Sequence, residues 1–354
     1  MEKRPIKKQA TLSDIAEAAG VAMMTVSRVV SGDGYVSDDT RKKVLKVVKD
    51  LNYRRNGLAR SLKRQTTETV GLVLGDISNP FSTELARSVR QTLLEKGFNL
   101  FICISENGAN EDVVAFESLA NHSVDGIIVA TRSNMGGDAY LRRLVDTNVP
   151  IVAIGRDFQH SNVDLVSPDN FKGGFDATQH LIDLGHRRIA FIGANLSSGS
   201  QLKRLQGYLK ALEINSIQID EQLITGRAEE TVESPGYSTE EIGFEAMNRL
   251  LSLPQPPTAV FARNDFTAIG AMRAAKDAGL QIPADISIVG FDDIPLAARM
   301  SPSLTTVRQP MRVEGQIAAE MLLERIKKGE PITRRERILN CELIVRESSG
   351  LRGR

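Results

Sequence analysis

Charged, amide and aromatic side chains recur directly after short apolar runs in the second part of this 354-residue chain. They lie in the segments Asp76–Phe81, Gly155–Asp157, Asn195–Arg204, Arg263–Asp265 and Asp292–Asp293. Carboxylates, amides and guanidinium groups form hydrogen bonds to hydroxyls, and a phenyl ring covers the apolar face of a sugar ring. The set indicates binding of a polyhydroxylated small molecule. The sequence has no tryptophan, so ring contact falls to Phe81 and Phe266.

The apolar runs themselves have the length and composition of buried strands. They are Val70–Leu74, Leu100–Ile104, Gly126–Ala130, Ile151–Ile154, Ile189–Ile192, Ala259–Ala262 and Ile286–Val289. Helical stretches separate most of them: Thr83–Lys96, Asp112–His122, Asp138–Asp146, Phe171–Leu184, Ser200–Leu212, Thr239–Leu251 and Phe266–Ala278. This alternation predicts an α/β fold with doubly wound parallel sheets. Ligands of such sheets bind beyond the carboxyl ends of the strands, which is where the polar side chains stand.

The strand series breaks near residues 152–157 and restarts near Asp164, which predicts two similar lobes. A helix at Met311–Lys328 and a strand at Ile338–Val345 follow and could carry the chain between the lobes more than once. We expect one lobe to contain residues 68–160 and about 295–328. We expect the other to contain residues 161–294 and about 329–354.

The charge of the chain is divided unevenly. Residues 1–64 contain 15 Lys and Arg against 7 Asp and Glu, a net charge of +8, whereas the rest of the chain carries −7. A small basic head on a larger acidic body suggests that the head meets a polyanion. A solvated lysine-rich tail is the alternative.

The basic head, residues 1–55, has the pattern of three short helices. Thr11–Ala19 is helical in its apolar spacing, with Thr11 or Ser13 as cap and Gly20 as stop. Met23–Val30 follows after a tight turn, and the third helix runs from about Asp38 to Leu51. Two short helices joined by a tight glycine turn form a helix-turn-helix.

Both halves of the chain resemble the lactose/galactose repressor (LacI/GalR) family of bacterial transcription regulators. In the head, the resemblance lies in the run Thr11–Ser31, in Val36-Ser37 and in Leu51–Tyr53. In the body it lies in Asn79–Phe81, Asp169-Asn170, Arg204-x-x-Gly207, Asn264-Asp265, Gly290–Asp293 and Leu304–Val307. It implies a two-lobed effector domain similar to periplasmic sugar-binding proteins.

The resemblance implies that the second helix of the head lies in the major groove of double-stranded DNA. The implied contacts are Thr11, Met23, Met24, Thr25, Ser27, Arg28, Ser31 and Tyr35 in the head, and Asn56, Ala59, Leu62 and Lys63 in the hinge. Met23 and Met24 stand at the base-reading positions, where they could touch thymine methyl groups but cannot donate a hydrogen bond. Ala22 replaces the usual polar cap, and Met23 could instead pack with Val26 in the core.

Residues 56–67 are predicted to form a basic hinge helix and linker. Leu58, Ala59 and Leu62 have helical spacing, but so short a helix is marginal in isolation and needs a partner. The resemblance implies that two copies pack in the minor groove, with Leu62 inserted between base pairs. An ordinary interdomain linker is the alternative.

For the effector, the expected contacts are Asp76, Phe81, Arg156, Ser200, Arg204, Asn264 and Asp292. Arg156 stands where sugar binders of the family often carry an acid, so an acidic or phosphorylated ligand remains open. Asp292 and Asp293 could instead cap a turn, and Asp169 is expected to cap the following helix.

Other functional classes have less support. No nucleophile motif, metal-ligand spacing or phosphate-binding loop accompanies the four histidines, so structural roles are expected for them, without enzymatic activity, cofactor or metal. Cys103 and Cys341 are expected to be buried thiols. No apolar run could cross a bilayer and none follows the basic start, so a cytoplasmic protein is expected. A transported-sugar-binding protein and an α/β enzyme are the alternatives.

We therefore predict a homodimeric transcription regulator, in the role of a repressor, that binds a near-palindromic operator. A small-molecule effector, a sugar or sugar derivative, would control its affinity for that operator. Whether the effector releases DNA or promotes binding stays open. A dimer is preferred over a tetramer because residues 348–354 lack a leucine heptad.

Overall fold

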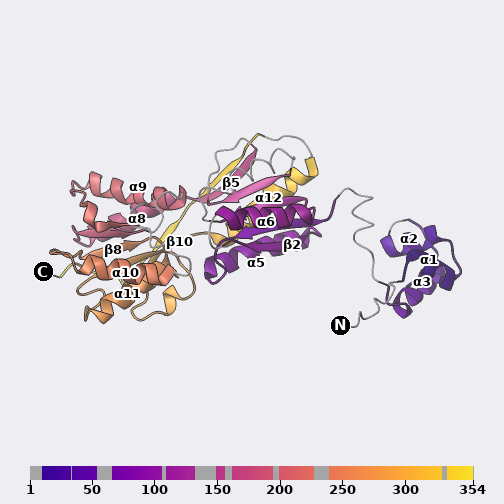
Figure 1. The fold of residues 1–354 in the computed structure, drawn as a ribbon, viewed down its shortest axis with the longest axis horizontal. Helices are drawn as coiled ribbons and strands as arrows, with labels where there is room; N and C mark the ends of the chain where they lie inside the picture. Colours follow the sequence, from indigo (N-terminus) through magenta and orange to yellow (C-terminus); the bar gives the residue numbers. More distant parts are fainter. Residues whose placement is uncertain are drawn as a thin grey trace. The chain divides into compact units, whose positions relative to one another are not determined.

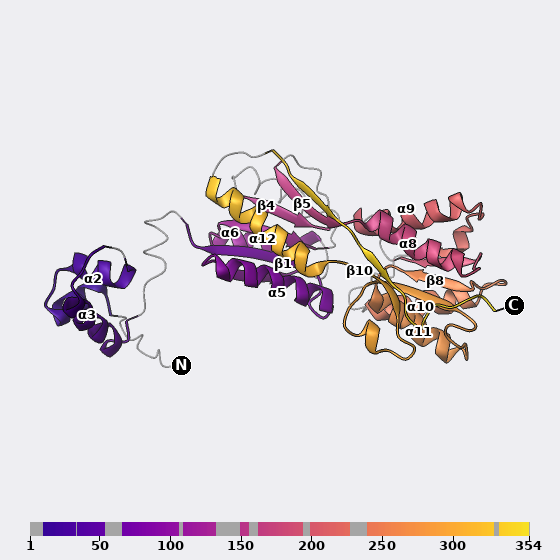
Figure 2. The same cartoon turned by 180° about the vertical axis from the view of Figure 1, so that it is seen from behind.

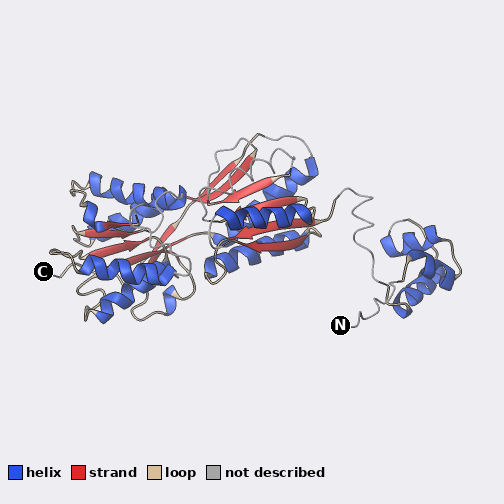
Figure 3. Ribbon diagram, in the orientation of Figure 1, coloured by secondary structure: helices blue, strands red, loops and turns tan. Residues whose placement is uncertain are grey.

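The computed structural model describes residues 10–32, 34–53, 66–105, 109–131, 149–155, 162–193, 199–226, 239–328 and 333–353. The chain divides into two compact units, the head Met1–Thr67 and the body Glu68–Arg354 (Figure 1). Helices and strands alternate through the body, whereas the described part of the head is helical (Figure 3). No described helix is long and apolar enough to span a membrane.

The head contains the three predicted helices, α1 (Leu12–Ala19), α2 (Met23–Ser31) and α3 (Asp38–Asp50). Their apolar faces meet in one small core made of Ile15, Ala19, Val26, Val29 and Val44. Thr11 caps α1: its Oγ1 accepts a hydrogen bond from the Asp14 amide, and its own amide donates to the Asp14 carboxylate. Gly20 then ends α1 with a φ of +58°, which glycine adopts without strain.

The first lobe of the body is a parallel six-stranded sheet in the order β11-β5-β4-β3-β1-β2. Its strands are β1 (Thr69–Leu74), β2 (Asn99–Ile104), β3 (Gly126–Ala130), β4 (Ile151–Ile154), β5 (Val163–Pro168) and β11 (Glu336–Leu339). Helices α5 (Pro80–Glu95) and α12 (Met311–Lys328) pack in one apolar core on one face, and α6 (Ala109–Asn121) packs on the other.

The second lobe is a sheet in the order β12-β10-β9-β8-β6-β7, in which only the β10–β12 pair is antiparallel. Its strands are β6 (Ile189–Ile192), β7 (Ile224–Thr225), β8 (Ala259–Ala262), β9 (Ser287–Asp292), β10 (Thr305–Arg308) and β12 (Glu342–Ile344). Helices α8 (Asn170–Asp183) and α9 (Gly199–Ile214) cover one face, and α10 (Thr239–Leu251) and α11 (Asp265–Asp277) cover the other.

In the described part of the body, three segments carry the chain between the lobes: residues 168–170, 308–311 and 339–342. The last of them is visible as the long yellow trace of Figure 2. Their positions correct the predicted lobe boundaries. Strands β5 and β11 belong to the first sheet rather than the second, and β10 pairs with β9 in the second sheet rather than joining the first. The single strand predicted at Ile338–Val345 is two strands in different sheets.

The physical reason for these corrections is composition. Polar residues interrupt β5 and β10: Asp164 and Ser167 lie in the first, and Thr305 and Thr306 in the second. Neither segment therefore has the continuous apolar pattern that the prediction used. In β5, Asp164 is fully buried and accepts hydrogen bonds from Arg325 of α12 and from Arg335, which precedes β11. Although burial raises the pKa of Asp164, these hydrogen bonds outweigh it and hold the pKa below its ordinary value.

Candidate functional site

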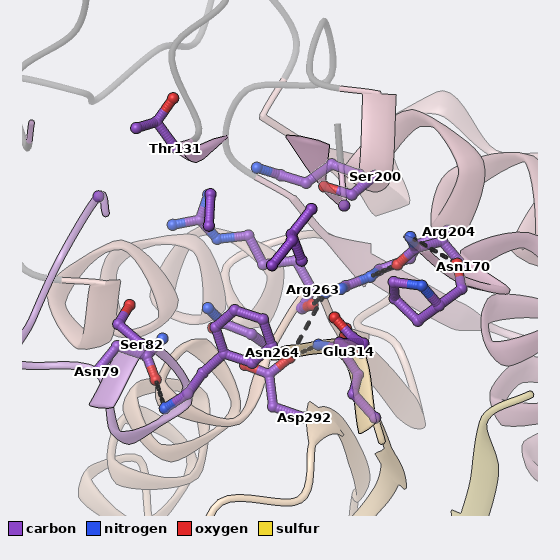
Figure 4. Close-up of a pocket in the computed structure, with 18 of the residues that line it drawn as sticks. Asn79, Ser82, Thr131, Asn170, Ser200, Arg204, Arg263, Asn264, Asp292 and Glu314 are labelled. Atoms are coloured by element: carbon purple, nitrogen blue, oxygen red, sulfur yellow. Dashed lines mark hydrogen bonds and ion pairs between the residues drawn. The ribbon is translucent and has the colours of Figure 1, made fainter. Parts of the chain in front are cut away.

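One cavity of the body lies at the carboxyl ends of strands from both sheets (Figure 4). Its empty volume, including the open mouth, is about 860 Å³. The lining residues are Gly75, Asp76, Asn79, Phe81, Ser82, Ala130, Thr131, Ile154, Gly155, Pro168, Asn170, Gly199, Ser200, Gln201, Arg204, Arg263, Asn264, Asp292, Gln309 and Glu314. Because both lobes and two of the three connecting segments contribute to it, a bound molecule would contact both lobes at once.

The cavity brings together the described effector contacts predicted from the sequence. Six of the seven line it: Asp76, Phe81, Ser200, Arg204, Asn264 and Asp292. The seventh, Arg156, lies outside the described residues. Their proximity agrees with the expectation that polar groups at the ends of parallel strands converge, while their contact with a ligand stays a prediction.

The turn after β1 positions the aromatic ring of the site. Asp76 Oδ1 accepts a hydrogen bond from the Ser78 amide at 2.7 Å, and Asn79 Oδ1 caps α5 by accepting from the Phe81 amide at 2.9 Å. Pro80 at the first helical position favours the same start. The ring of Phe81, half-buried, packs against the apolar cores of both lobes.

Arg204 is held in the second lobe by contacts to Nε, to Nη1 and to one face of its guanidinium. Its Nε donates to Asn170 Oδ1 at 2.8 Å, its Nη1 donates to the Arg263 carbonyl, and its Cζ lies 3.6 Å from the centroid of the Phe291 ring. Nη1 also lies 4.0 Å from Asp292 Oδ1. The guanidinium is thereby fixed at the cavity wall with little rotational freedom.

Close backbone contact between α8 and α9 explains the glycine three residues after Arg204, at position 207. A Cβ atom on Gly207 would lie 2.2 Å from the Phe171 carbonyl oxygen, and one on Gly174 would lie 2.3 Å from that of Arg204. Any side chain at these two positions would push α9 away from α8. Gly207 therefore allows α9 to pack closely on α8, and this packing places Arg204 at the cavity.

Asp292, at the end of β9, has a φ of +119°, which an L-residue adopts only under strain. The hydrogen bond from the Gln309 side chain to its carboxylate joins it to the second connecting segment. Asp293 is different, because it forms ion pairs with Arg308 at 2.7 Å and Arg346 at 2.5 Å and does not line the cavity. Asp292 thus lines the cavity. Asp293 instead links the end of β9 to Arg308 of β10 and to Arg346, which follows β12.

Asn264, which lines the cavity, and the neighbouring Asp265 fix the start of α11 and the segments around it. Asn264 Oδ1 caps α11 by accepting from the Thr267 amide at 2.9 Å. Asp265 is fully buried and accepts hydrogen bonds from the Ile294 amide at 2.8 Å and from Thr306 Oγ1 at 2.5 Å. Burial, together with the negative charge of Asp292, raises the pKa of Asp265 well above its ordinary value.

Eight polar residues of the lining are absent from the expected contacts: Asn79, Ser82, Thr131, Asn170, Gln201, Arg263, Gln309 and Glu314. Three of them, Asn79, Gln201 and Arg263, lie in strand-end segments that the sequence did mark. Glu314 could have been found, because it lies three residues after Met311 and four before Ala318 on the buried face of its helix. A charged residue within an apolar stripe is an exception to helical patterning. Asn170 stands in the motif Asp169-Asn170, but that motif indicated no contact with the effector. Gln309 lies in a connecting segment, and no pattern of the sequence marks it.

The described histidines and the two cysteines are not among the residues that line the cavity. His186 hydrogen-bonds to Thr258 Oγ1 and Ser287 Oγ, each at 3.0 Å, and His180 to Ser349 Oγ at 2.9 Å. These hydrogen bonds agree with a structural role, which stays a prediction; His160 lies outside the described residues. Cys103 and Cys341 are free thiols and half-buried rather than buried. Burial raises the pKa of both thiols, to about 12 for Cys341.

In the head, α2 presents an exposed face of predicted DNA contacts. Met23 and Met24 are 59% and 66% exposed, so Met23 does not pack in the core with Val26. Arg28 lies on the same face and is also exposed. Ala22 provides no side-chain cap for α2, as expected.

The remaining predicted DNA contacts of the head lie on α2, in the segment that follows it and at the start of α1. Tyr35 is 92% exposed, Thr25 and Ser27 are half-buried, and Ser31 Oγ donates to the Arg28 carbonyl at 3.2 Å. Thr11 has its place as the cap of α1. The hinge contacts Asn56, Ala59, Leu62 and Lys63 lie outside the described residues.

A helix-turn-helix head with an exposed second helix and a two-lobed α/β body with a cavity at its strand ends define a class: DNA-binding transcription regulators with a ligand-binding domain. Residues 11–56 match the model of the bacterial regulatory proteins of the lacI family, and residues 178–349 match the periplasmic binding protein-like domain. The chain belongs to the LacI family of bacterial regulatory proteins, as its resemblance predicted.

Several relatives match nearly the whole chain. The transcriptional regulator DegA of Bacillus subtilis is 36% identical over 340 residues, which cover 96% of this chain and 98% of DegA. The ribose operon repressor of Escherichia coli is 36% identical over 342 residues, covering 96% and 99%. The transcriptional repressor PurR of Mannheimia succiniciproducens is 34% identical over 341 residues, covering 96% and 98%.

Solved structures show the same architecture. The Lac repressor dimer bound to operator and the anti-inducer ONPF has a TM-score of 0.82 at 28% identity and covers 97% of this chain and 100% of its own. A LacI-family regulator from Enterococcus faecium with bound ribose has a TM-score of 0.70 at 30% identity and covers 80% of this chain and 99% of its own.

Proposed function

We propose that this regulator is a homodimeric repressor in the cytoplasm that binds a near-palindromic operator, and that a sugar or sugar derivative in the cavity controls its operator affinity. The observation that carries the proposal is the cavity itself. It combines a half-buried phenyl ring, Phe81, with the guanidinium of Arg204 and the carboxylate of Asp292. These groups suit the apolar face and the hydroxyls of a sugar.

The relatives support a sugar ligand and a dimer. Ribose is bound in the Enterococcus faecium structure, and the Lac repressor was solved as a dimer on its operator. Two identical heads would read two half-sites related by the two-fold axis of the dimer. In each head, Met23 and Met24 would touch thymine methyl groups, and Arg28 would donate to a phosphate or a guanine edge.

Control of DNA binding would follow from the position of the cavity. A molecule that contacts both lobes stabilises one arrangement of the three connecting segments over others, which shifts the population of the whole body. The coupling is reciprocal, so operator DNA changes the effector affinity by the same factor. Either sign, release of DNA or tighter binding, is compatible with this scheme.

A thermal-shift screen tests the effector part. Uncharged pentoses, hexoses and disaccharides, with amino sugars, sugar phosphates and nucleobases as other classes, are added to the purified chain. A ligand that binds the native state stabilises it by mass action and so raises Tm. At a ligand concentration of 100 times Kd, the unfolding free energy rises by about 2.7 kcal/mol. Arg204→Ala should abolish the shift, whereas Lys203→Ala, on the exposed side of the same helix, should leave it unchanged. A shift that survives in Arg204→Ala would show that the effector binds elsewhere.

A salt titration tests the DNA part. Neutralising roughly 6–10 phosphates predicts a steep fall of log affinity with log salt for an operator fragment. A flat dependence, or equal affinity for every promoter fragment, would contradict sequence-specific binding by the head.

A further inference from the structure

Glu314 occupies an unusual position in the floor of the cavity (Figure 4). It lies in the first turn of α12, immediately after the connecting segment 308–311, and is 0% exposed. The helix cannot easily turn this side chain outward. At the next position, a Cβ atom on Gly315 would lie only 3.0 Å from the Leu85 carbonyl oxygen, so α12 packs closely against α5.

Neither carboxyl oxygen of Glu314 has a hydrogen-bond partner among the described residues. The other buried acids of the described chain have one. Asp112 accepts from Ser105 Oγ, Asp164 from two arginines, Asp265 from an amide and a hydroxyl, and Asp292 from Gln309. Glu314 differs from all of these, although it is as deeply buried.

A buried carboxyl without a partner destabilises the folded chain, and an apolar side chain of similar size would pack there without that cost. Groups that violate packing rules in this way are concentrated at functional sites. Because the side chain of Glu314 lines the cavity, the partner it lacks in the protein can come from a bound molecule.

Charged groups around Glu314 determine its protonation. Burial chiefly, and the negative charge of Asp292 on β9, raise its pKa to about 8, against the opposing effect of Arg204 on α9. Cys341, between β11 and β12, is the other titratable group coupled to it. On α5, which packs against α12, Glu84 forms an ion pair with Arg312 of α12 at 3.2 Å, and Arg312 is exposed. At neutral pH the carboxyl is therefore mostly neutral, with one O–H donor and one free acceptor oxygen.

We propose that Glu314 is a specificity-determining contact of the effector, and that its protonated carboxyl donates a hydrogen bond to one oxygen of an uncharged, hydroxyl-rich molecule and accepts one from a neighbouring hydroxyl. The proposal rests on the effector site proposed above and narrows its ligand class. A phosphate or carboxylate at this place would lie near the charge of Asp292, and an ammonium group would instead draw the proton from Glu314. Since Glu314 belongs to the first lobe and Arg204 to the second, the molecule would bridge the lobes.

Two substitutions test whether the carboxyl of Glu314 binds in its neutral form. Glu314→Gln keeps the shape and the donor and acceptor of a neutral acid, whereas Glu314→Leu removes both. Glu320→Gln, an exposed acid on the same helix, is the matched control. Isothermal titration with D-ribose, D-xylose, D-glucose and cellobiose, and with D-glucosamine and D-ribose 5-phosphate as charged counterparts, measures Kd from pH 6 to pH 9.

The proposal predicts that at least one uncharged sugar binds and that its Kd rises roughly tenfold in Glu314→Leu, the effect of one or two lost hydrogen bonds. In Glu314→Gln and Glu320→Gln, Kd at pH 7 should stay within about threefold of the wild-type value, a loss smaller than one hydrogen bond. The affinity of the wild type for the sugar should fall above pH 8, whereas the affinity of Glu314→Gln should not change with pH. Glu314→Leu should fold at least as stably as the wild type, so its weaker binding does not reflect unfolding.

Three results would overturn the proposal: binding of D-glucosamine or D-ribose 5-phosphate alone, an unchanged Kd in Glu314→Leu, or no response to any uncharged sugar of the panel. Arg204→Ala identifies which idea has failed. If this variant still binds the sugar, the proposed site is wrong. If it loses binding while Glu314→Leu retains it, the site is right and the role of Glu314 is wrong.

Discussion

The head and the body place their functional groups in opposite ways. In the head, most of the predicted DNA contacts that the structure describes lie on α2, where Met23, Met24 and Arg28 are exposed, and the core beneath is made of five apolar residues. In the body, the predicted effector contacts that the structure describes are buried or half-buried and come from helices and strand ends far apart in the sequence. The exposed contacts of the head can therefore change one residue at a time, whereas contacts of the body such as Arg204 and Asp292 also hold neighbouring elements in place.

This difference has an energetic consequence. Removing an exposed contact of the head should change DNA binding with little effect on folding, since surface substitutions typically alter stability by less than about 0.5 kcal/mol. Removing a buried polar group of the body should change stability and ligand binding together. The following predictions test this contrast, beginning with the largest effect.

Arg325→Ala should destabilise the body by about 3–4 kcal/mol, because two charge-assisted hydrogen bonds to the buried carboxylate of Asp164 are lost and Arg335 alone remains as its cation. Chemical denaturation followed by circular dichroism measures the loss. Arg312→Ala is the control, since its ion pair with Glu84 is exposed and should contribute less than about 1 kcal/mol. Equal effects of the two variants would contradict the contrast between buried and exposed groups.

Ile15→Ala should destabilise the head by about 3 kcal/mol, because it leaves a cavity in a core of five residues. Operator binding, measured by fluorescence anisotropy, should be lost or greatly weakened, while the thermal shift with an effector sugar stays as in the wild type. Leu45→Ala, which alters a 49% exposed side chain, should leave operator binding unchanged. A parallel loss of the sugar response would show that the two units do not fold independently.

Glu314→Leu should remove part of the pH dependence of stability. The pKa of Glu314 is raised from 4.5 to about 8 in the folded chain, so the folded state holds its proton more tightly than the unfolded state. Its contribution is fully present below pH 4.5 and is lost as the pH rises through 8. Between pH 6 and pH 8 the unfolding free energy of the wild type should fall by about 2 kcal/mol more than that of the variant. Parallel pH profiles would contradict the raised pKa.

Arg28→Ala should weaken operator binding by about 1–3 kcal/mol if the guanidinium reads a guanine, and should relax specificity at one base pair. If Arg28 contacts a phosphate, the loss should be equal on all sequences and should reduce the salt slope by about one. Competition with operator variants distinguishes the two contacts. The unfolding free energy of the head should stay within about 0.5 kcal/mol of the wild type in either case.

The sequence predicted the head more completely than the body. The apolar spacing of Ile15, Ala19 and Val26 and the stop at Gly20 are local signals, and the three helices begin and end within a residue or two of the predicted positions. The doubly wound class of the body was also correctly predicted, because most of its strands are continuous apolar runs.

The body was harder to predict where its organisation depends on distant residues. The polar strands β5 and β10 form because partners such as Arg325 and Ser348 satisfy the buried side chain of Asp164 and the amide of Thr305. The local sequence around β5 and β10 does not indicate these distant hydrogen-bond partners. The cavity residues at strand ends were predicted from the alternation of strands and helices, whereas Gln309 and Asn170 depend on where the chain crosses between lobes. Glu314 was missed although its position on an apolar helical face was visible.

The most direct test of the account measures operator affinity of the purified full chain with and without the sugar that gives the largest thermal shift. The account predicts a change in operator affinity of about 5–150-fold, the usual range of allosteric coupling, and no change in Arg204→Ala. An operator affinity that is the same with and without the sugar, or a change of equal size in Arg204→Ala, would contradict it.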